Sequence, residues 1–248
     1  NILLQRGEAY SGNQSEIDPY LGEAYFFRAY NYFYLLKYFG GVPIITVPLD
    51  TDSPELQKPR NSRYEVADLI LSDLQNAISR LPKEQNIATS DKGHISEQGA
   101  KAFKARVLLY EATWRKYNKT STDYEGSAGP KSDQVNEFLE ESISLSKDVL
   151  DDEVFRIWNH NNELDNLSSR YLFCLEDGSQ TGGYGKDSNK EFIIYSVFDR
   201  VLNAGAFSLN NEMNYIYPTR KFIDMFVCTN GMPTTNNEQF KGYQNVTD

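Results

Sequence analysis

The first strongly periodic segment follows Asp18-Pro19, where apolar residues recur every three to four positions. That spacing places them on one face of a helix. Asp can cap the amides of the first turn and Pro suits the first helical position, so we expect the helix to begin there. It should end at Gly40-Gly41-Val42-Pro43, because Gly accepts the left-handed cap and Pro cannot continue a helix. The apolar positions are Leu21, Tyr25, Ala29, Tyr32 or Phe33, Leu36 and Phe39.

A second helix is predicted from a capping box at Ser62 and Glu65, in which each side chain satisfies a free amide at the other residue. Pro82 should end it. Its apolar stripe consists of Val66, Leu69 or Ile70, Leu74, Ala77 or Ile78, and Leu81. Between the two helices, residues 42–60 carry four prolines and predict an extended connector.

Two further helices are expected, over residues 96–117 and 134–150, with a polar, Gly/Ser-rich loop at 118–133 between them. After Asp151 the helical pattern weakens into short strands or irregular segments, such as residues 191–195. A short helix is predicted near 219–227. The third helix has helical spacing at Ala100, Phe103, Val107, Leu108, Tyr110, Glu111 and Trp114.

The first two helices carry halves of the tetratricopeptide pattern, Leu21-Gly22-x-x-Tyr25 and Leu74-x-x-Ala77-x4-Pro82. In that repeat, small residues let two paired helices approach closely. The connector separates the halves, and residues 96–150 match the pattern poorly. From these residues alone, a tetratricopeptide pair and an unrelated helical fold both remain open.

Charge narrows the classes of ligand, since 35 acidic residues outnumber 25 basic ones and give a net charge of −10. Nucleic acid is disfavoured, because phosphate binding needs clustered Lys and Arg, and an anionic membrane surface is disfavoured likewise. Neutral or cationic ligands and protein partners remain open. No apolar run reaches the length of a spanning helix, and residues 1–15 do not read as a signal peptide. The chain opens in mid-pattern, so we expect a segment upstream of it.

Residues 22–50, GEAYFFRAYNYFYLLKYFGGVPIITVPLD, resemble the signature helix and stop of SusD/RagB proteins. Four later segments resemble that family in the same order: 60–82, 93–118, 190–195 and 217–231. Asn230 stands where the family usually has Asp, and the loop at 118–133 does not align.

This resemblance implies a mainly α-helical fold of tetratricopeptide-like helix pairs followed by an irregular region of helix, loop and short strands. Residues 1–248 would form one incomplete domain, with the scaffold at 18–150 and a ligand-facing region at 151–248. Members of the family are lipid-anchored at the bacterial outer-membrane surface, bind glycans without catalysis and dock onto a SusC-like, TonB-dependent transporter. They begin with a lipidated Cys and are longer, so the anchor and a C-terminal part are expected outside this chain.

The residues give no indication of catalysis or of a cofactor. His94 and His160 are the only histidines, and neither lies in a HExxH motif or at metal-ligand spacing from a Cys. No GxSxG elbow is present. The Gly-rich loop at 178–186 is not a phosphate loop, because Gln180 stands where the first Gly is needed and Asp187 follows the lysine.

The loop at 176–190, which contains this Gly-rich stretch, is the candidate ligand site. It places Tyr184 among Asp177, Gln180, Asp187 and Asn189. A sugar is recognised by aromatic faces that pack on its C–H groups and by planar polar side chains that bind its hydroxyls. Glycines allow the backbone to approach a ligand closely. The alternative is an ordinary surface loop.

Trp158, beside Asn159, has the same aromatic and amide character and is a second candidate, whereas Trp114 on the helical stripe is expected in the core. Asp187, Asn189 and Glu191 alternate as Ca²⁺ ligands could, but the EF-hand Gly is absent and a solvated loop is expected.

Cys174 and Cys228 could form a disulfide or remain two thiols. Two other functions also stay open, namely capture of a peptide on the same scaffold and a generic tetratricopeptide-type adaptor that binds a protein partner.

Overall fold

The computed structural model describes residues 1–118, 129–130, 132, 134–175, 182–195, 219–228 and 230–233, except for the side chain of Cys174. The chain divides into two compact units, Asn1–Val197 and Phe198–Asp248. Each unit is described by itself below.

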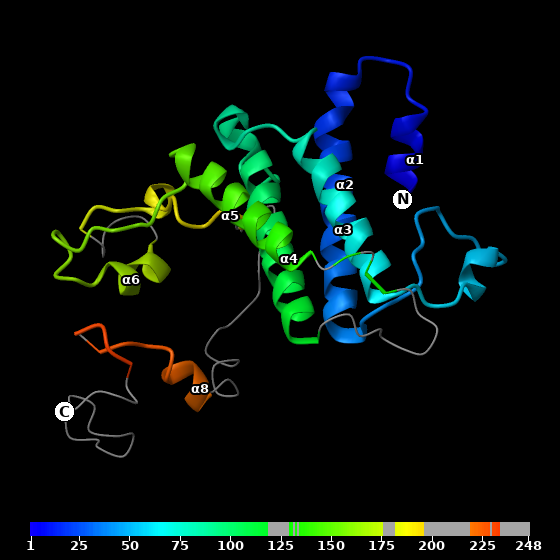
Figure 1. Ribbon diagram of the computed structural model, residues 1–248. Helices are drawn as coiled ribbons and strands as arrows, with labels where there is room; N and C mark the ends of the chain where they lie inside the picture. Colours follow the sequence, from blue (N-terminus) through cyan, green and yellow to red (C-terminus); the bar gives the residue numbers. More distant parts are fainter. Residues whose placement is uncertain are drawn as a thin grey trace. The chain divides into compact units, whose positions relative to one another are not determined.

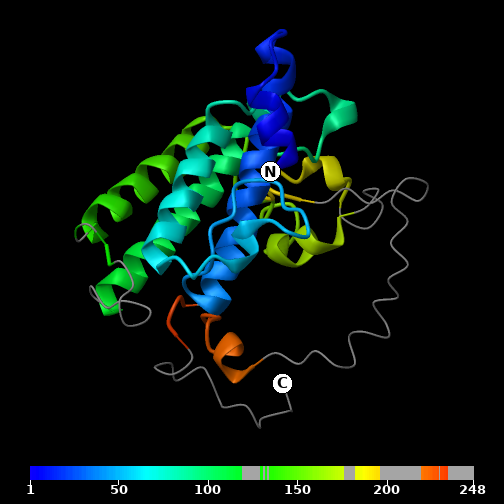
Figure 2. The same cartoon turned by 90° about the vertical axis from the view of Figure 1, so that its right-hand side faces the viewer.

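Four long helices form the first part of the larger unit: α2 (Gln14–Phe39), α3 (Arg63–Ile78), α4 (Glu97–Asn118) and α5 (Val135–Asp151). Each packs against the next, and successive helices run in opposite directions (Figures 1 and 2). The short helix α1 (Ile2–Glu8) lies beside α2. This arrangement of antiparallel pairs confirms the predicted tetratricopeptide-like, mainly helical fold. None of the described helices is long and apolar enough to cross a membrane.

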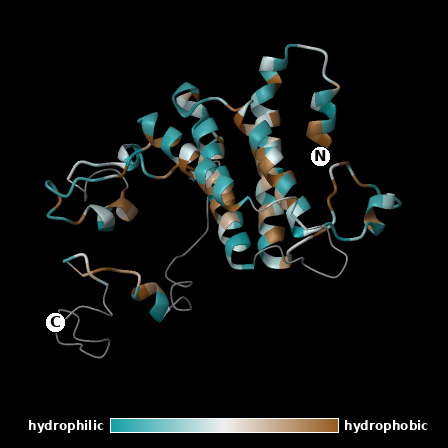
Figure 3. Ribbon diagram, in the orientation of Figure 1, coloured by the Kyte–Doolittle hydropathy of each residue, from teal (hydrophilic) through white to brown (hydrophobic). Residues whose placement is uncertain are grey.

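The main core lies where α2, α3 and α4 meet, and aromatic rings fill much of it. Phe103 on α4 contacts three rings of α2, with centroid distances of 5.4 Å to Phe26, 5.4 Å to Tyr30 and 5.6 Å to Phe33. Hydrophobic and hydrophilic residues alternate around the helices, as expected when one side is buried and the other exposed (Figure 3). These aromatic residues of α2 therefore form packing contacts.

Gly22 lies where α2 packs closely against Leu81, in the turn that follows α3. A Cβ atom at Gly22 would lie 2.8 Å from Cγ of Leu81, inside van der Waals contact. The short α1 approaches α2 in the same way, because a Cβ atom at Gly7 would lie 2.3 Å from Cδ2 of Leu21. The small residue of the Leu21-Gly22 motif therefore has the role that the pattern indicated, which is to let two helices pack closely.

Two helix ends follow the local signals in the sequence. The capping box is formed, with Ser62 Oγ accepting from the Glu65 amide (3.2 Å) and Glu65 Oε2 accepting from the Ser62 amide (2.8 Å). Helix α2 ends at Phe39 and Gly40 caps it, as expected, with its amide donating to the Leu36 carbonyl at 3.0 Å. Its φ of 69° is positive, but its ψ of −130° lies outside the left-handed helical conformation that was expected.

The predicted start of α2 at Asp18-Pro19 is wrong, because the helix begins at Gln14. Asn13 provides the cap, with its side-chain oxygen accepting from the Ser15 amide at 3.3 Å. Pro19 therefore lies in the second turn, where its missing N–H leaves the Ser15 carbonyl without an intrahelical donor. The predicted end of α3 is also late, since the helix stops at Ile78 and a turn leads on to Pro82.

The connector between α2 and α3 is fastened at its base. Arg60 donates from Nε to the Gly41 carbonyl (2.7 Å) and from Nη2 to the Phe39 carbonyl. Asn61 accepts from the Ile44 amide (2.9 Å) and donates its own amide to the Val42 carbonyl (3.2 Å). The connector is otherwise extended as predicted, apart from the short 3₁₀ helix η1 (Pro54–Gln57).

After α5 the chain folds around a second, small core of Trp158, Leu164, Leu172 and Leu175. The larger unit also contains short helices. Before α4 lie η2 (Glu84–Asn86) and η3 (Thr89–Asp91), and after α5 lie α6 (Ser168–Tyr171), η4 (Leu172–Cys174) and η5 (Lys186–Ser188). The described residues contain no strand, so the short strands expected here are not found and residues 191–195 are irregular. An extended segment needs a neighbouring ladder to become a strand, and residues 191–195 have none.

The described part of the smaller unit contains α8 (Arg220–Ile223). Thr219 caps it by accepting from the Phe222 amide at 3.2 Å. The helix is shorter than the predicted 219–227, because Gly231, with a φ of 76°, turns the chain back so that Cys228 donates to the Met232 carbonyl at 3.0 Å. Cys228 is a free thiol.

Candidate functional site

Two loops of the larger unit lie side by side and build the candidate site. The Arg156 amide donates to the Lys190 carbonyl at 2.9 Å, and the Trp158 amide donates to Glu191 Oε2 at 3.0 Å. These bonds join loop 156–160 to loop 184–191. Segments about 30 residues apart in sequence therefore share one surface.

Trp158 forms the floor of this surface. Its side chain is buried, with 4% of its area exposed, and its indole N–H donates to Ser188 Oγ at 3.1 Å. Ser188 Oγ in turn donates to the Gly185 carbonyl at 2.6 Å. The indole is thus held by packing and by a hydrogen bond, and only a small part of it can meet a ligand.

Three rings from the two loops meet beside that floor. His160 lies against Tyr184, with centroids 3.9 Å apart and ring planes inclined by 34°. Trp158 meets both rings edge-on, at 4.7 Å from His160 and 5.6 Å from Tyr184. The sequence brought Trp158 and Tyr184 forward as separate candidates, and the structure places them in one cluster. It also adds His160, which the sequence did not single out as a ligand-site residue.

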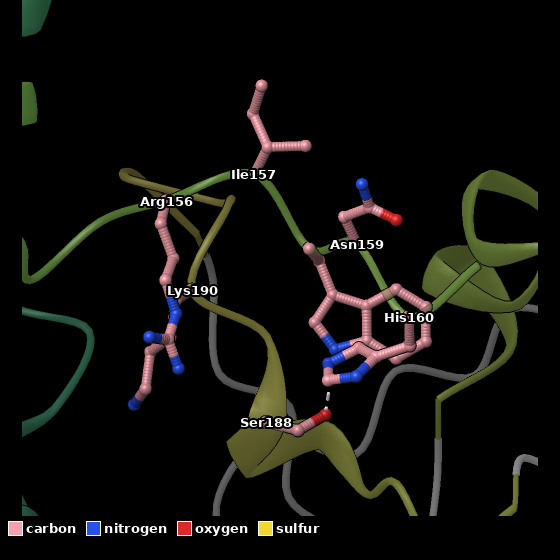
Figure 4. Close-up of a pocket in the computed structure, with 7 residues that line it drawn as sticks. Arg156, Ile157, Asn159, His160, Ser188 and Lys190 are labelled. Atoms are coloured by element: carbon pink, nitrogen blue, oxygen red, sulfur yellow. Dashed lines mark hydrogen bonds between the residues drawn. The ribbon is translucent and has the colours of Figure 1, made fainter. Parts of the chain in front are cut away.

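A cavity of about 320 Å³ opens next to these rings. Its lining consists of residues 156–160 together with Ser188 and Lys190 (Figure 4). Polar groups predominate, including the amide of Asn159, the hydroxyl of Ser188 and the imidazole of His160. The cavity can therefore offer hydrogen bonds beside an aromatic wall, which is the combination that orients a polar organic ligand.

The remaining predicted residues have other surroundings. Asp187 is exposed and does not line the cavity. Asn189 uses its side-chain oxygen to accept from the amides of Glu191 (2.9 Å) and Phe192 (3.3 Å), which fixes the turn after η5. Asp177 and Gln180 lie outside the described residues. Ligand binding by Tyr184, Asp187, Asn189 and Trp158 stays a prediction.

The Ca²⁺ alternative gains no support from this geometry. The side-chain oxygen of Asn189 and one carboxylate oxygen of Glu191 already accept backbone hydrogen bonds. Across the part of the chain that the structure describes, no group of three or more His, Cys, Asp or Glu side chains could hold a metal ion.

Comparisons of sequence and of structure both find similarity to the same kind of protein. Residues 1–109 match the SusD-like family described as "Starch-binding associating with outer membrane". The chain is 43% identical over 91 residues to the SusD-like protein P38 of Formosa agariphila. The N-terminal part of the chain is therefore similar to SusD-like proteins, over a match that covers less than half of its residues. A second curated SusD-like protein, from Bacteroides ovatus, is 28% identical over 156 residues.

Solved SusD-like structures share the fold. One from Bacteroides fragilis superposes over 90% of this chain with a TM-score of 0.59 and 23% identity. A SusD superfamily protein from the same species covers 81% with a TM-score of 0.54 and 19% identity. At these identities the likeness concerns the fold alone.

The chain spans only part of the length of the proteins that it matches. The matched segments cover 37% of this chain and 17% of the Formosa protein, and 61% of this chain and 26% of the Bacteroides ovatus protein. The superposition on the first Bacteroides fragilis structure covers 38% of that chain. The family match ends at residue 109, within α4, so the cavity lies outside the matched residues.

Proposed function

We propose that this SusD-like chain binds an oligosaccharide without chemically altering it, at the outer surface of a bacterial outer membrane. The family description, starch binding in association with the outer membrane, supports both parts of this proposal. We further propose that the bound glycan passes to a SusC-like, TonB-dependent transporter. The membrane attachment would be a lipid anchor outside the present chain, as the family resemblance implies.

The observation that carries the proposal is the meeting of an aromatic wall with neutral polar groups in one cavity. Trp158 and His160 present ring atoms to the cavity, and Asn159 and Ser188 supply an amide and a hydroxyl. Tyr184 packs against His160 from outside the lining. Sugars need both kinds of contact, because their C–H faces pack on rings while their hydroxyls form directional hydrogen bonds.

The size of the cavity suits partial enclosure. At about 320 Å³ it lies at the small end of ligand sites, so it would hold one or two sugar units while the rest of a chain stays in solvent. Limited enclosure gives moderate affinity. Dissociation constants between about 1 mM and 1 μM, or about −4 to −8 kcal/mol, would allow release to a transporter.

The helical layer of α2 to α5 is the proposed docking surface for the transporter. Paired antiparallel helices form stiff scaffolds with broad faces that suit protein contacts. Copurification of a TonB-dependent β-barrel with the full-length protein would support this assignment, and its consistent absence would count against it.

Calorimetric titration of the chain with a panel of neutral and acidic oligosaccharides tests the binding proposal. We expect saturable binding to one class of sugar, with a loss of about tenfold or more in Asn159→Ala. Tyr184→Ala should cause a smaller loss, because it removes the ring that packs against His160. Tyr117→Ala is the matched control, because Tyr117 on α4 is 75% exposed and does not line the cavity. Binding that the two site variants leave intact would remove the cavity from the proposal.

Fluorescence gives a second readout, since Trp114 and Trp158 are the only tryptophans. In Trp114→Phe, all tryptophan emission comes from Trp158 in the floor of the cavity, so ligand should change it. Mass spectrometry of the recovered oligosaccharide should show it intact. Cleaved product, or no saturable binding by chain shown to be folded by circular dichroism, would contradict the proposed function.

A further inference from the structure

The cavity carries a charge opposite to that of the chain. The whole sequence has a net charge of −10, yet the lining contains Arg156 and Lys190 and no acidic residue. The two residues are held next to each other by the bond between the Arg156 amide and the Lys190 carbonyl. In Figure 4 both side chains extend to the same side, whereas Ile157 points the opposite way.

Several other basic residues of the larger unit are paired with acids. Lys83, Lys92 and Lys101 each form an ion pair with an acidic side chain, at 3.3, 2.9 and 2.9 Å. Arg156 and Lys190 form no ion pair with any described residue, and both are exposed. No described acidic side chain therefore neutralises either charge.

The neighbouring acid does not occupy this position. Glu191 follows Lys190 in sequence, but its Oε2 accepts the Trp158 amide at 3.0 Å and its side chain does not line the cavity. Asp187, the other acid of loop 184–191, is exposed and also lies outside the lining. An anion entering the cavity would meet two cations at the rim before it met either carboxylate.

We propose that the cavity selects an acidic sugar, whose carboxylate or sulfate group binds between Arg156 and Lys190. This inference rests on the proposed function, because it names the ligand class of the same site. Arg presents paired N–H donors that match the two oxygens of a carboxylate, and Lys adds a compact charge. The sugar ring would then lie beside His160 and Tyr184, where its hydroxyls can reach Asn159.

A comparison of matched sugars by calorimetry tests the proposal. The probes are trigalacturonic acid, its neutral methyl ester and a sulfated galactose oligosaccharide with its unsulfated counterpart. At least one acidic probe should bind about tenfold or more tightly than its neutral partner. Raising the ionic strength should weaken binding of the acidic probe and leave that of the neutral one nearly unchanged.

Variants locate the effect. Arg156→Gln and Lys190→Gln should each weaken binding of the acidic probe about tenfold and alter binding of the neutral one little. Lys186→Gln is the matched control, because Lys186 is an exposed cation of the same loop outside the cavity lining. It removes the same charge and should have little effect. Circular dichroism establishes that each variant is folded.

The outcomes separate this inference from the proposed function. Preference for only the uronate or only the sulfated probe would support the inference and identify the anionic group. Equal binding of acidic and neutral probes, unaffected by Arg156→Gln, would overturn the inference and leave glycan binding standing. Equal weakening by Lys186→Gln would also overturn it, because the effect would then be one of total charge. Absence of binding to every sugar would overturn both.

Discussion

Arg28 on α2 and Asp73 on α3 form a two-pronged ion pair across the first helix pair. Nε and Nη2 of Arg28 donate to the two carboxylate oxygens of Asp73, each at 2.7 Å. The side chain of Asp73 is only 2% exposed and that of Arg28 15% exposed. Burial raises the pKa of Asp73 above its ordinary value, although Arg28 opposes the shift. The carboxylate therefore depends on its arginine to remain charged inside the fold.

We predict that Arg28→Ala lowers the free energy of unfolding by about 3 kcal/mol at neutral pH, because it leaves a buried carboxylate without its cation. Urea denaturation measures the loss. Arg80→Ala is the control, since Arg80 faces Asp18 at 3.8 Å with both side chains about a third exposed. Such a surface pair should cost less than about 1 kcal/mol.

The same variant should respond to pH with a defined sign. Without Arg28 the folded-state pKa of Asp73 rises further above the unfolded value, so the folded form takes up a proton as the pH falls. The stability lost in Arg28→Ala should therefore be partly regained between about pH 7 and about pH 4. A deficit that stays constant over this range would contradict the assignment.

The capping box of α3 predicts an acid-sensitive helix start. The Ser62 backbone amide donates to Glu65 and lowers the pKa of that carboxyl group. A lowered folded-state pKa gives stability that is present at neutral pH and is lost as the pH falls through that pKa. Glu65→Gln should therefore reduce stability at about pH 7 and have little effect at about pH 3. Glu137→Gln, in the first turn of α5, where the side chain of the cap residue Gln134 makes no capping bond, should show a weaker pH dependence.

Two helical glycines should respond to alanine with opposite signs. In a helix, Ala is favoured over Gly by up to about 1 kcal/mol. At Gly99 the nearest atoms to an added Cβ lie 3.5 Å away, so Gly99→Ala should be neutral or stabilising. At Gly22 the added Cβ would meet Leu81 at 2.8 Å, and overpacking of this kind costs about 1–3 kcal/mol. Thermal melts would compare the two variants, and a stabilised Gly22→Ala would disprove close packing at this position.

A buried charge network predicts the largest single loss of stability. Glu111 is fully buried between Arg63 and Arg115, and burial raises its pKa while the two arginines oppose the rise. Glu111→Ala would leave both cations buried without their carboxylate, at a cost of about 3–5 kcal/mol. Glu140→Ala, an exposed acid on α5, should change stability by less than about 0.5 kcal/mol. Denaturant titration distinguishes these values.

That network also has an optical signature. The Arg63 guanidinium lies 4.0 Å from the centre of the Trp114 ring, which is half-buried and not in the core as the sequence suggested. If Glu111→Ala releases Arg63, the emission of Trp114 should shift relative to that of the parent chain. With Trp158→Phe introduced into both chains, all tryptophan emission comes from Trp114.

Capping residues, glycines and prolines predicted most ends of the scaffold helices well, because their effects extend over only a few residues. The start of α3 is specified by hydrogen bonds between Ser62 and Glu65. The end of α2 is specified locally as well, by Gly40 and the nearby Pro43. The error at the start of α2 has the same local origin. Asn13 and Asp18 are both acceptable caps, and residue type alone does not decide between them.

The candidate site was predictable only in part. Aromatic and amide character singled out Trp158 and Tyr184, but their pairing depends on bonds between loops 156–160 and 184–191. No short pattern encodes such a contact, so His160 and Ser188 could not be recognised beforehand. The Trp158-Asn159-His160 sequence was the available signal, and the stacking of His160 on Tyr184 was not visible in it.

Because the two ends of the connector before α3 are held together, its length should have little effect on the stability of the α2–α3 pair. Arg60 and Asn61 hold the two ends of the connector together, so the chain between them leaves and returns at fixed points. Adding residues to a closed loop costs only about 0.6 kcal/mol per doubling of its length. The exposed turn at Thr51-Asp52 is thus a natural place to insert an epitope or a reporter domain.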